Sequence, residues 1–156
     1  MKKKIVITGG LGYIGTELCK LYSGVSWHHE IIVIDNRFFS ERVNQIRNWN
    51  MKFIQGDILD KNLIKKYCKD ANVVHHLAGI TDVPRTKNES SLLQDEKIKE
   101  VGEKGTQNIL DVISKNCKII FPSTHVVYEG INEVKLDIKE NELTKPVLSY
   151  SSSKAI

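Results

Sequence analysis

Short apolar runs rich in β-branched residues recur along the chain, separated by segments of helical length. The runs lie at residues 5–7, 31–34, 51–54, 72–76 and 118–121, of which 51–54 is the weakest. They are nearly continuous rather than alternating, which is typical of strands buried on both faces of a sheet. Strand and helix alternate, so the pattern predicts an α/β fold: a doubly wound parallel sheet with helices on both faces.

The segments between the runs predict the helices. The longest helix should extend from about Ser91 to Lys115, because apolar residues and glycines repeat there at three- and four-residue steps. Gly102 and Gly105 belong to this stripe, which implies that the helix backbone closely approaches the sheet or a ligand. The other predictions are two shorter amphipathic helices, at residues 40–49 and 61–69, and two loops, at residues 82–90 and 130–146.

Length and composition limit this picture. A chain of 156 residues with 40% hydrophobic content can bury one sizeable core, so we expect a single domain over residues 1–156. The net charge of +4 comes from lysines spread along the chain, which argues against a nucleic-acid partner. No apolar run approaches the ~20 residues that span a bilayer, and the one after the first lysines is too short for an export signal. We therefore expect no membrane partner and a cytoplasmic protein.

The cysteines and histidines do not form a ligand pattern. Cys19, Cys68 and Cys117 are odd in number, far apart and without a Cys-x-x-Cys motif, which argues against a disulfide framework and against a zinc site. The pairs His28-His29 and His75-His76 have no third ligand at a useful spacing, and neighbouring residues of a strand point to opposite faces. We therefore expect no metal.

A glycine pattern directly follows the first predicted strand and opens a helix, with Gly9, Gly12 and Gly15 at three-residue steps. Such a turn lets the backbone approach a pyrophosphate and aims the helix N-terminus at the anion. Asp35, twenty residues beyond Gly15, ends the second strand. A carboxylate there accepts hydrogen bonds from ribose hydroxyls and repels a 2′-phosphate. The pattern predicts a Rossmann-type domain that prefers NAD to NADP, although the nearby Arg37 is a usual phosphate partner.

Five motifs, in this order and spacing, resemble the NAD-dependent epimerase/dehydratase family of extended short-chain dehydrogenases/reductases, especially its UDP-glucose 4-epimerase branch. They are Thr8-Gly9-Gly10-Leu11-Gly12-Tyr13-Ile14-Gly15, Asp35-Asn36, Gly56-Asp57-Ile58, His76-Leu77-Ala78-Gly79 and Tyr150-Ser151-Ser152-Ser153-Lys154. The resemblance covers essentially the whole chain. It implies a Rossmann-type sheet truncated before the family's C-terminal substrate-binding domain.

The resemblance implies NAD as the cofactor. The residues that it places at NAD are Gly9, Gly12, Tyr13, Ile14, Gly15, Asp35, Asn36, Asp57, Ile58, Leu77, Ala78, Gly79, Tyr150 and Lys154. Within this set, Asp57 would bind the adenine amino group and the backbone of Ile58 would meet the adenine ring. Residues 77–79 would line the nicotinamide side.

The implied catalytic residues are Thr124, Tyr150 and Lys154. Tyr150 and Lys154 are one helical turn apart, so both side chains can face one ligand, and the ammonium favours the phenolate. By the resemblance, Tyr150 is a general base that takes the proton of a substrate hydroxyl while the carbon beneath it gives a hydride to the nicotinamide. Thr124, three residues before Val127-Tyr128, would orient the reacting oxygen, with Ser123 as the reserve candidate.

The function that this implies is an NAD-dependent epimerase or dehydrogenase acting on a nucleotide-activated sugar through a transient 4-keto intermediate. The dehydratase branch carries an Asp-Glu pair after its threonine, whereas this chain has His125-Val126, which favours the epimerase branch. Gly102 stands where the family usually has Asn. Together with the missing sugar-binding part, it supports a second hypothesis: a non-catalytic dinucleotide-binding module or an inactive fragment.

The expected partners are a nucleotide-sugar substrate and a second copy of the chain, bound through the long central helix. We expect the 156 residues alone to bind NAD without turning over a sugar nucleotide, because the family's sugar-binding part is needed to hold the reacting groups in place.

Overall fold

A computed structural model of the chain describes residues 2–81 and 92–155. They fall into two compact units. The first, here called the sheet unit, comprises Met1–Gly79 and Gly105–Pro122. The second, here called the helical unit, comprises Ile80–Lys104 and Ser123–Ile156. The expected single domain is therefore organised as two units, which are described separately.

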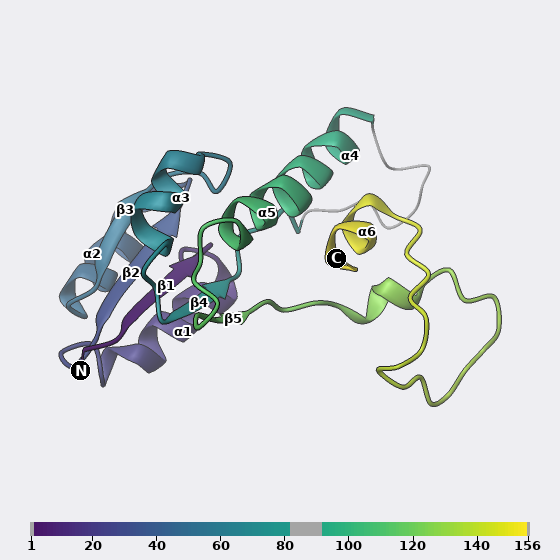
Figure 1. Ribbon diagram of the computed structural model, residues 1–156, viewed down its shortest axis with the longest axis horizontal. Coiled ribbons are helices and arrows are strands. Elements are labelled where there is room, and N and C mark those ends of the chain that lie inside the picture. The colour runs from purple at the N-terminus through teal and green to yellow at the C-terminus, as the bar shows by residue number, and fades with distance from the viewer. Residues whose placement is uncertain (1, 82–91, 156) are drawn as a thin grey trace. The chain divides into compact units, whose positions relative to one another are not determined.

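The sheet unit is built on five parallel strands in the order β3-β2-β1-β4-β5 (Figure 1). Their bounds are β1 Lys4–Thr8, β2 Glu30–Asp35, β3 Lys52–Gln55, β4 Val73–His76 and β5 Lys118–Ile120. Each predicted strand is confirmed to within one residue at either end. The central strands are buried on both faces, as their continuous apolar composition predicted.

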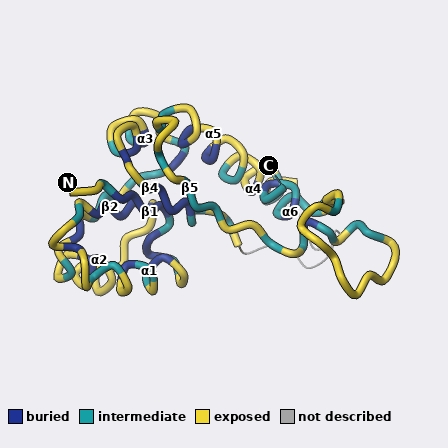
Figure 2. Tube along the Cα trace, turned by 60° about the horizontal axis from the view of Figure 1, so that its bottom comes forward, coloured by how far each residue is buried: buried dark blue, intermediate teal, exposed yellow. Residues whose placement is uncertain are grey.

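Four helices cover the two faces of this sheet. They are α1 Tyr13–Ser23, α2 Ser40–Asn48, α3 Lys61–Cys68 and α5 Gly105–Leu110. In Figure 2, α1 and α2 lie on one side of the buried strands, and α3 and α5 lie on the other. On the first side, Cys19 of α1 and Val43 of α2 pack in one cluster with Ile7 and Val33. The doubly wound Rossmann-type fold is thereby confirmed.

The strand register brings the candidate loops to one edge of the sheet. Thr8 at the end of β1 is opposite Ile34 of β2 and His76 of β4, and Asp35 is opposite Gln55 of β3. The chain winds from β1 outward to β3 and then crosses to β4 on the other side of β1. In open α/β sheets a ligand binds beyond the carboxyl ends of the strands, at such a switch point.

The helical unit contains α4 Leu92–Lys99, the π-helix η2 Glu100–Lys104, the 3₁₀-helix η3 His125–Tyr128 and α6 Ser149–Lys154. Within this unit α6 packs against α4, η2 and η3. Residues 130–146 contain no helix or strand, as predicted, whereas the loop predicted at residues 82–90 lies outside the described residues. No helix in the described part of the chain is both long and apolar enough to span a membrane.

The predicted end of the longest helix is wrong. From Leu92 the helix continues through η2 into α5, but α5 ends at Leu110 rather than near Lys115. The N–H groups of Val112 and Ile113 both donate to the Ile109 carbonyl at 3.2 Å, so the regular hydrogen-bond ladder closes there. The apolar stripe continues past Leu110, so the sequence pattern does not indicate where the helix ends. The predicted start at Ser91 lies outside the described residues.

Candidate functional site

The glycine turn between β1 and α1 forms a tightly packed cradle. Gly9 has a φ of 69°, which favours glycine, and its N–H donates to the Ile34 carbonyl at 2.8 Å. A Cβ at Gly9 would lie 2.6 Å from the Ala78 nitrogen, and a Cβ at Gly15 would lie 2.4 Å from the Gly9 oxygen. Neither position accepts a side chain without displacing backbone. The turn therefore depends on glycine at positions 9 and 15.

The same turn is open where α1 begins. A Cβ at Gly12 would meet only the Gly9 oxygen, at 3.1 Å, so its surroundings are otherwise free. The first turn of α1 carries no acidic residue, and its first N–H groups have no partner within the helix. Tyr13 and Ile14 are largely exposed beside it. These features fit a pyrophosphate held by the backbone at the positive end of the helix dipole.

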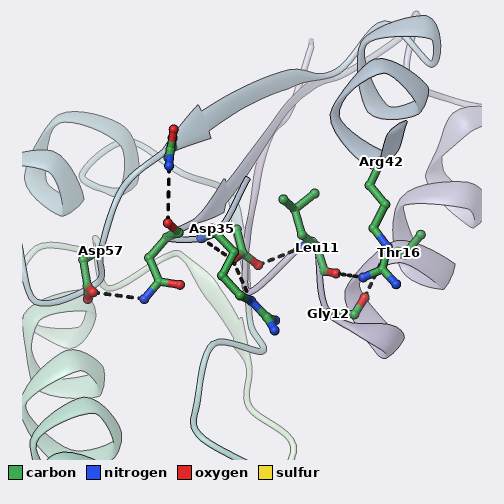
Figure 3. A network of polar contacts seen from close by, with 9 residues as sticks. Leu11, Gly12, Thr16, Asp35, Arg42 and Asp57 are labelled. Atoms are coloured by element: carbon green, nitrogen blue, oxygen red, sulfur yellow. Dashed lines mark hydrogen bonds and ion pairs between the residues drawn. The ribbon is translucent and has the colours of Figure 1, made fainter. Parts of the chain in front are cut away.

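Asp35 lies at the end of β2 and is buried, with 5% of its surface exposed. Its carboxylate accepts the N–H of Leu11 and the N–H of Arg37, each at 3.0 Å, and lies 3.6 Å from the Arg37 guanidinium (Figure 3). A carboxylate offers about four acceptor positions, so capacity remains for a ribose hydroxyl. The guanidinium of Arg42 in turn donates to the Leu11 carbonyl, which ties the turn to α2.

Asn36 and Asp57 are joined directly. The Asn36 amide donates to the Asp57 carboxylate at 3.1 Å (Figure 3). The other carboxylate oxygen accepts the Leu59 N–H at 2.9 Å. Ile58 is buried, and its carbonyl accepts the Asn108 side chain at 3.0 Å. A Cβ at Gly105 would lie 2.4 Å from Cδ1 of Ile58. The helix backbone does approach its neighbour closely at Gly105, but the neighbour is Ile58 in the loop after β3 and not, as predicted, the sheet or a ligand.

The end of β4 leads into Leu77, Ala78 and Gly79 beside the glycine turn. The Thr8 carbonyl accepts the Leu77 N–H at 3.1 Å, and the Thr8 hydroxyl accepts the Ala78 N–H at 3.4 Å. That hydroxyl also lies 2.8 Å from Nδ1 of the fully buried His76. The predicted nicotinamide-side segment is thus anchored to β1.

The histidine pair in β4 has a structural role that the sequence did not reveal. Nε2 of His76 lies 3.0 Å from the Thr106 hydroxyl, so the ring bridges β1 and α5. His75 points to the opposite side, where its Nε2 lies 2.8 Å from the Tyr22 hydroxyl. Burial lowers the pKa of His75, as does the nearby charge of Lys118. Among residues 2–81 and 92–155, no cluster of His, Cys, Asp or Glu is arranged to hold a metal ion.

The predicted catalytic residues all belong to the helical unit. Tyr150 and Lys154 are both in α6, and both are partly buried. Burial lowers the pKa of Lys154. Thr124 opens η3, where its hydroxyl accepts the Val126 N–H at 3.4 Å, and the Ser123 hydroxyl donates to the Lys154 carbonyl at 2.9 Å. The spacing prediction for Tyr150 and Lys154 on one helix is therefore confirmed.

Two further contacts in the helical unit were missed from the sequence. A Cβ at Gly102 would lie 2.5 Å from the Ser153 Cβ, so α6 occupies the space that the family's Asn side chain would need. The carboxylate of Glu129, directly after η3, accepts hydrogen bonds from the start of α6. Gly102 was noted as a departure from the family, but no local pattern indicated Glu129.

The predicted site residues divide between the two units. All those from Gly9 to Gly79 lie in the sheet unit, and the structure gathers them at the carboxyl ends of β1, β2, β3 and β4. Thr124, Tyr150 and Lys154 lie in the helical unit. The sheet unit therefore presents a candidate dinucleotide site, and the helical unit presents a candidate proton-transfer site.

Comparison with known proteins identifies the family of this chain. The 3-beta hydroxysteroid dehydrogenase/isomerase family matches residues 6–156. The chain belongs to this family, and its relatives confirm the resemblance to the epimerases and dehydratases among extended short-chain dehydrogenases/reductases.

Three relatives illustrate the match. The dTDP-D-glucose 4,6-dehydratase of Dictyostelium discoideum is 30% identical over 98% of this chain and 38% of its own length. The UDP-N-acetyl-alpha-D-glucosaminuronate decarboxylase of Bacillus cytotoxicus is 35% identical over 82% of this chain and 38% of its own. The crystal structure of UDP-glucose 4-epimerase from Bifidobacterium longum, in complex with NAD+ and UDP, is 27% identical with a TM-score of 0.76, over 97% of this chain and 46% of that one. The chain spans less than half the length of each relative.

Proposed function

We propose that the sheet unit binds NAD and that the protein containing this chain is an NAD-dependent epimerase, or dehydrogenase, of nucleotide-activated sugars. The observation that carries the proposal is the open glycine turn at Gly12 beside the buried carboxylate of Asp35. A pyrophosphate and an adenosine ribose need these two features at the ends of neighbouring strands. The relatives' nucleotide-sugar reactions support the substrate class.

The sheet unit offers the contacts that the adenine half of NAD would need. Backbone N–H groups at Tyr13 and Ile14 would hold the pyrophosphate, and Asp35 would accept the ribose hydroxyls. Asp57, oriented by Asn36, would accept the adenine amino group, and the backbone of Ile58 would face the ring. Leu77, Ala78 and Gly79 would line the nicotinamide side, where their anchoring to Thr8 fixes the shape of the wall.

In the proposed mechanism the proton transfers belong to α6. NAD, when bound, supplies a hydride acceptor and, on return, a hydride donor. Tyr150 takes the proton of the sugar 4-hydroxyl, and the nearby Lys154 ammonium stabilises the phenolate. The Thr124 hydroxyl hydrogen-bonds the same oxygen and orients it toward Tyr150. Return of the proton from Tyr150 to the same oxygen would complete the exchange once the configuration at that carbon has changed.

The residues after Thr124 favour epimerisation over dehydration. Elimination of water from the sugar needs an additional acid and base, and His125 and Val126 occupy the two positions where the dehydratase branch has them. Neither of these residues is a carboxylic acid. Of these two reactions, the residues after Thr124 therefore favour epimerisation.

A non-catalytic dinucleotide-binding module is the second candidate. The observation that favours it is Gly102, because Ser153 fills the space of the Asn that helps order the family's site. Under this hypothesis the sheet unit still binds NAD, but Tyr150 has no role. A measurement of turnover therefore distinguishes the two candidate functions, whereas a measurement of NAD binding does not.

Calorimetric titration of the 156-residue chain with NAD and NADP tests the binding proposal, and we expect NAD to bind more tightly. UDP-glucose, UDP-galactose and their N-acetyl forms then test the chemistry, with epimerised product and reduced cofactor as the readouts. We expect turnover from a protein that carries this chain together with the rest of the relatives' length, and none from the 156 residues alone. Turnover by the short chain would refute the expected dependence on a further substrate-binding part, and a lack of NAD binding would refute the proposal itself.

We also propose a homodimer through the helix formed by α4, η2 and α5. Leu92 and Leu93 at its start are more than four-fifths exposed, which suits an interface between two copies. Sedimentation equilibrium of the chain, compared with a Leu92→Ser, Leu93→Ser double variant, tests it. We expect a dimer that the double substitution weakens; a monomeric parent chain would refute it.

A further inference from the structure

Glu129 joins the end of η3 to the start of α6. One oxygen of its carboxylate accepts the N–H groups of Val147 at 2.8 Å and of Leu148 at 2.7 Å, and also accepts the Ser151 hydroxyl. Ser151 is fully buried, and its hydroxyl oxygen accepts the Leu148 N–H at 3.1 Å. A single side chain therefore contacts the residue before the N-cap, the N-cap itself and the first turn of α6.

This contact lies at the start of a helix that has no side-chain N-cap of its own. The N-cap residue is Leu148, whose side chain has no oxygen to accept a helix N–H. A helix of six residues is also far shorter than the ~12–15 residues at which an isolated helix becomes marginal. The carboxylate additionally lies at the end of the helix that favours negative charge. Much of the order of α6 must therefore come from its ties to other segments.

The charge of Glu129 is stabilised where it lies. Partial burial alone would raise its pKa, but hydrogen bonds from Ser151 and from the N–H groups of Leu148 and Val147 outweigh burial and leave the pKa below its usual value. The carboxylate is therefore ionised at neutral pH, when its hydrogen bonds to α6 are strongest.

The other end of α6 is tied to the other side of η3. The Ser123 hydroxyl donates to the Lys154 carbonyl at 2.9 Å, and Ser123 directly precedes Thr124. The helix flank is fixed as well, because Ser153 packs directly on Gly102. Glu129 and Ser123 thus flank the segment that carries Thr124 and hold both ends of the helix that carries Tyr150 and Lys154.

We propose that Glu129 is a positioning residue, which holds α6 against η3 so that Tyr150 and Lys154 keep their place relative to Thr124. The inference rests on the proposed function for the roles of those three residues. It assigns to Glu129 no contact with substrate or cofactor. Its effect on proton transfer is exerted through the first turn of α6.

Hydrogen exchange of the 156-residue chain tests the tie directly. Glu129→Ala should accelerate exchange of the amides at residues 150–154 by at least about tenfold, while the amides of β1 and β4 stay protected. Glu129→Gln keeps an acceptor oxygen and loses the charge. In this variant the exchange rate of the amides at residues 150–154 should therefore lie between the rates in the parent and in the alanine variant. Glu133→Gln is the matched control, because Glu133 is an exposed acid in the following loop.

A second readout reports on Lys154 itself. Its pKa is lowered by burial, so the pH profile of its acylation, followed by mass spectrometry, should have a midpoint below that of exposed lysines. Release of α6 exposes the ammonium, and the midpoint should move upward in Glu129→Ala but not in Glu133→Gln. A role confined to general stability would not move this midpoint selectively.

Unchanged exchange and an unchanged Lys154 profile in Glu129→Ala would overturn the proposal. If Glu129→Ala unfolds the helical unit, the test becomes a comparison of Glu129→Gln with Glu133→Gln. Equal exchange of the amides at residues 150–154 in these two variants would overturn the proposal. NAD titration of the same samples separates the two inferences. A parent chain that fails to bind NAD contradicts the proposed function, while the exchange data still decide whether Glu129 holds α6.

Discussion

The two units of this chain are stabilised in different ways. In the sheet unit, side chains such as Ile7, Val33 and Ile109 are fully buried between strands and helices. In the described part of the helical unit, Ile98 and Val127 are the only buried apolar side chains. Its remaining order comes largely from polar contacts that hold α6 at both ends.

This difference matches the division of the candidate site. A dinucleotide needs a rigid backbone turn, which a well-packed parallel sheet provides, because interiors at native packing density resist distortion. The candidate proton-transfer residues Tyr150 and Lys154 are on a short helix, and the contacts that hold this helix are few and partly exposed. Segments of this kind are the ones that open at low free-energy cost. Binding and catalysis should therefore respond separately to substitution, in the following order of size.

The largest expected effect is on cofactor binding in the sheet unit. Gly15→Val places a side chain where a Cβ already lies 2.4 Å from the Gly9 oxygen, so the turn must open. We expect NAD affinity to fall by about a hundredfold or more, because the N–H groups of the turn lose their alignment. Calorimetry measures it. Gly24→Ala is the control, since a Cβ at Gly24 meets nothing within 4 Å. An equal loss of NAD affinity in both variants would contradict the proposal that the glycine turn binds NAD.

The next effect separates chemistry from binding. In a protein that contains this chain and turns over a nucleotide-sugar, Tyr150→Phe should lower kcat by about two orders of magnitude and leave NAD affinity nearly unchanged. Phenylalanine retains the ring packing and removes only the proton acceptor. Steady-state kinetics and a cofactor titration check it. A variant that keeps more than about a tenth of the parent turnover would contradict the role assigned to Tyr150.

A smaller effect concerns the choice of cofactor. We expect NAD to be preferred over NADP by at least about tenfold, because Asp35 lies at the end of β2, where we propose that the ribose binds. The structure adds that Arg37 lies 3.6 Å from that carboxylate. Asp35→Ser should therefore reduce or reverse the preference by freeing the guanidinium for a 2′-phosphate, whereas Arg37→Gln should enlarge it. Titrations with both cofactors decide, and a preference unchanged in both variants would show that neither residue controls it.

The smallest effect is a pH dependence confined to α6. The pKa of Glu129 is lowered in the folded chain, so its stabilising contribution is fully present above the usual value of 4.5 and is lost as pH falls through the lowered value. Hydrogen exchange, corrected for its intrinsic pH dependence, should show residues 150–154 better protected in the parent than in Glu129→Gln at neutral pH. The difference should vanish in acid. A difference that persists at low pH would mean that the charge of Glu129 is unimportant.

Much of the sheet unit could be predicted because its signals are local. Each strand is a continuous apolar run, and the glycines at 9, 12 and 15 carry their meaning through their place between a strand and a helix. The helix end near Leu110 could not be predicted, because the apolar stripe does not stop where the hydrogen-bond ladder does. The roles of His76 and Gly102 also escaped prediction, since their partners, Thr106 and Ser153, are distant in sequence.

By itself the sequence determined the alternation of strands and helices, the glycine turn after β1, the acid at the end of β2 and the family. Each of these depends on residues that are neighbours in the chain or repeat at a fixed step. Only the tertiary structure decided which groups support them: His76 on Thr8, Asn36 on Asp57, and Glu129 at the start of α6. Folding brings together hydrogen-bond partners that are far apart in the sequence, so their pairing produces no periodic pattern. A buried polar residue and an exposed one can be of the same residue type, so the sequence does not distinguish them.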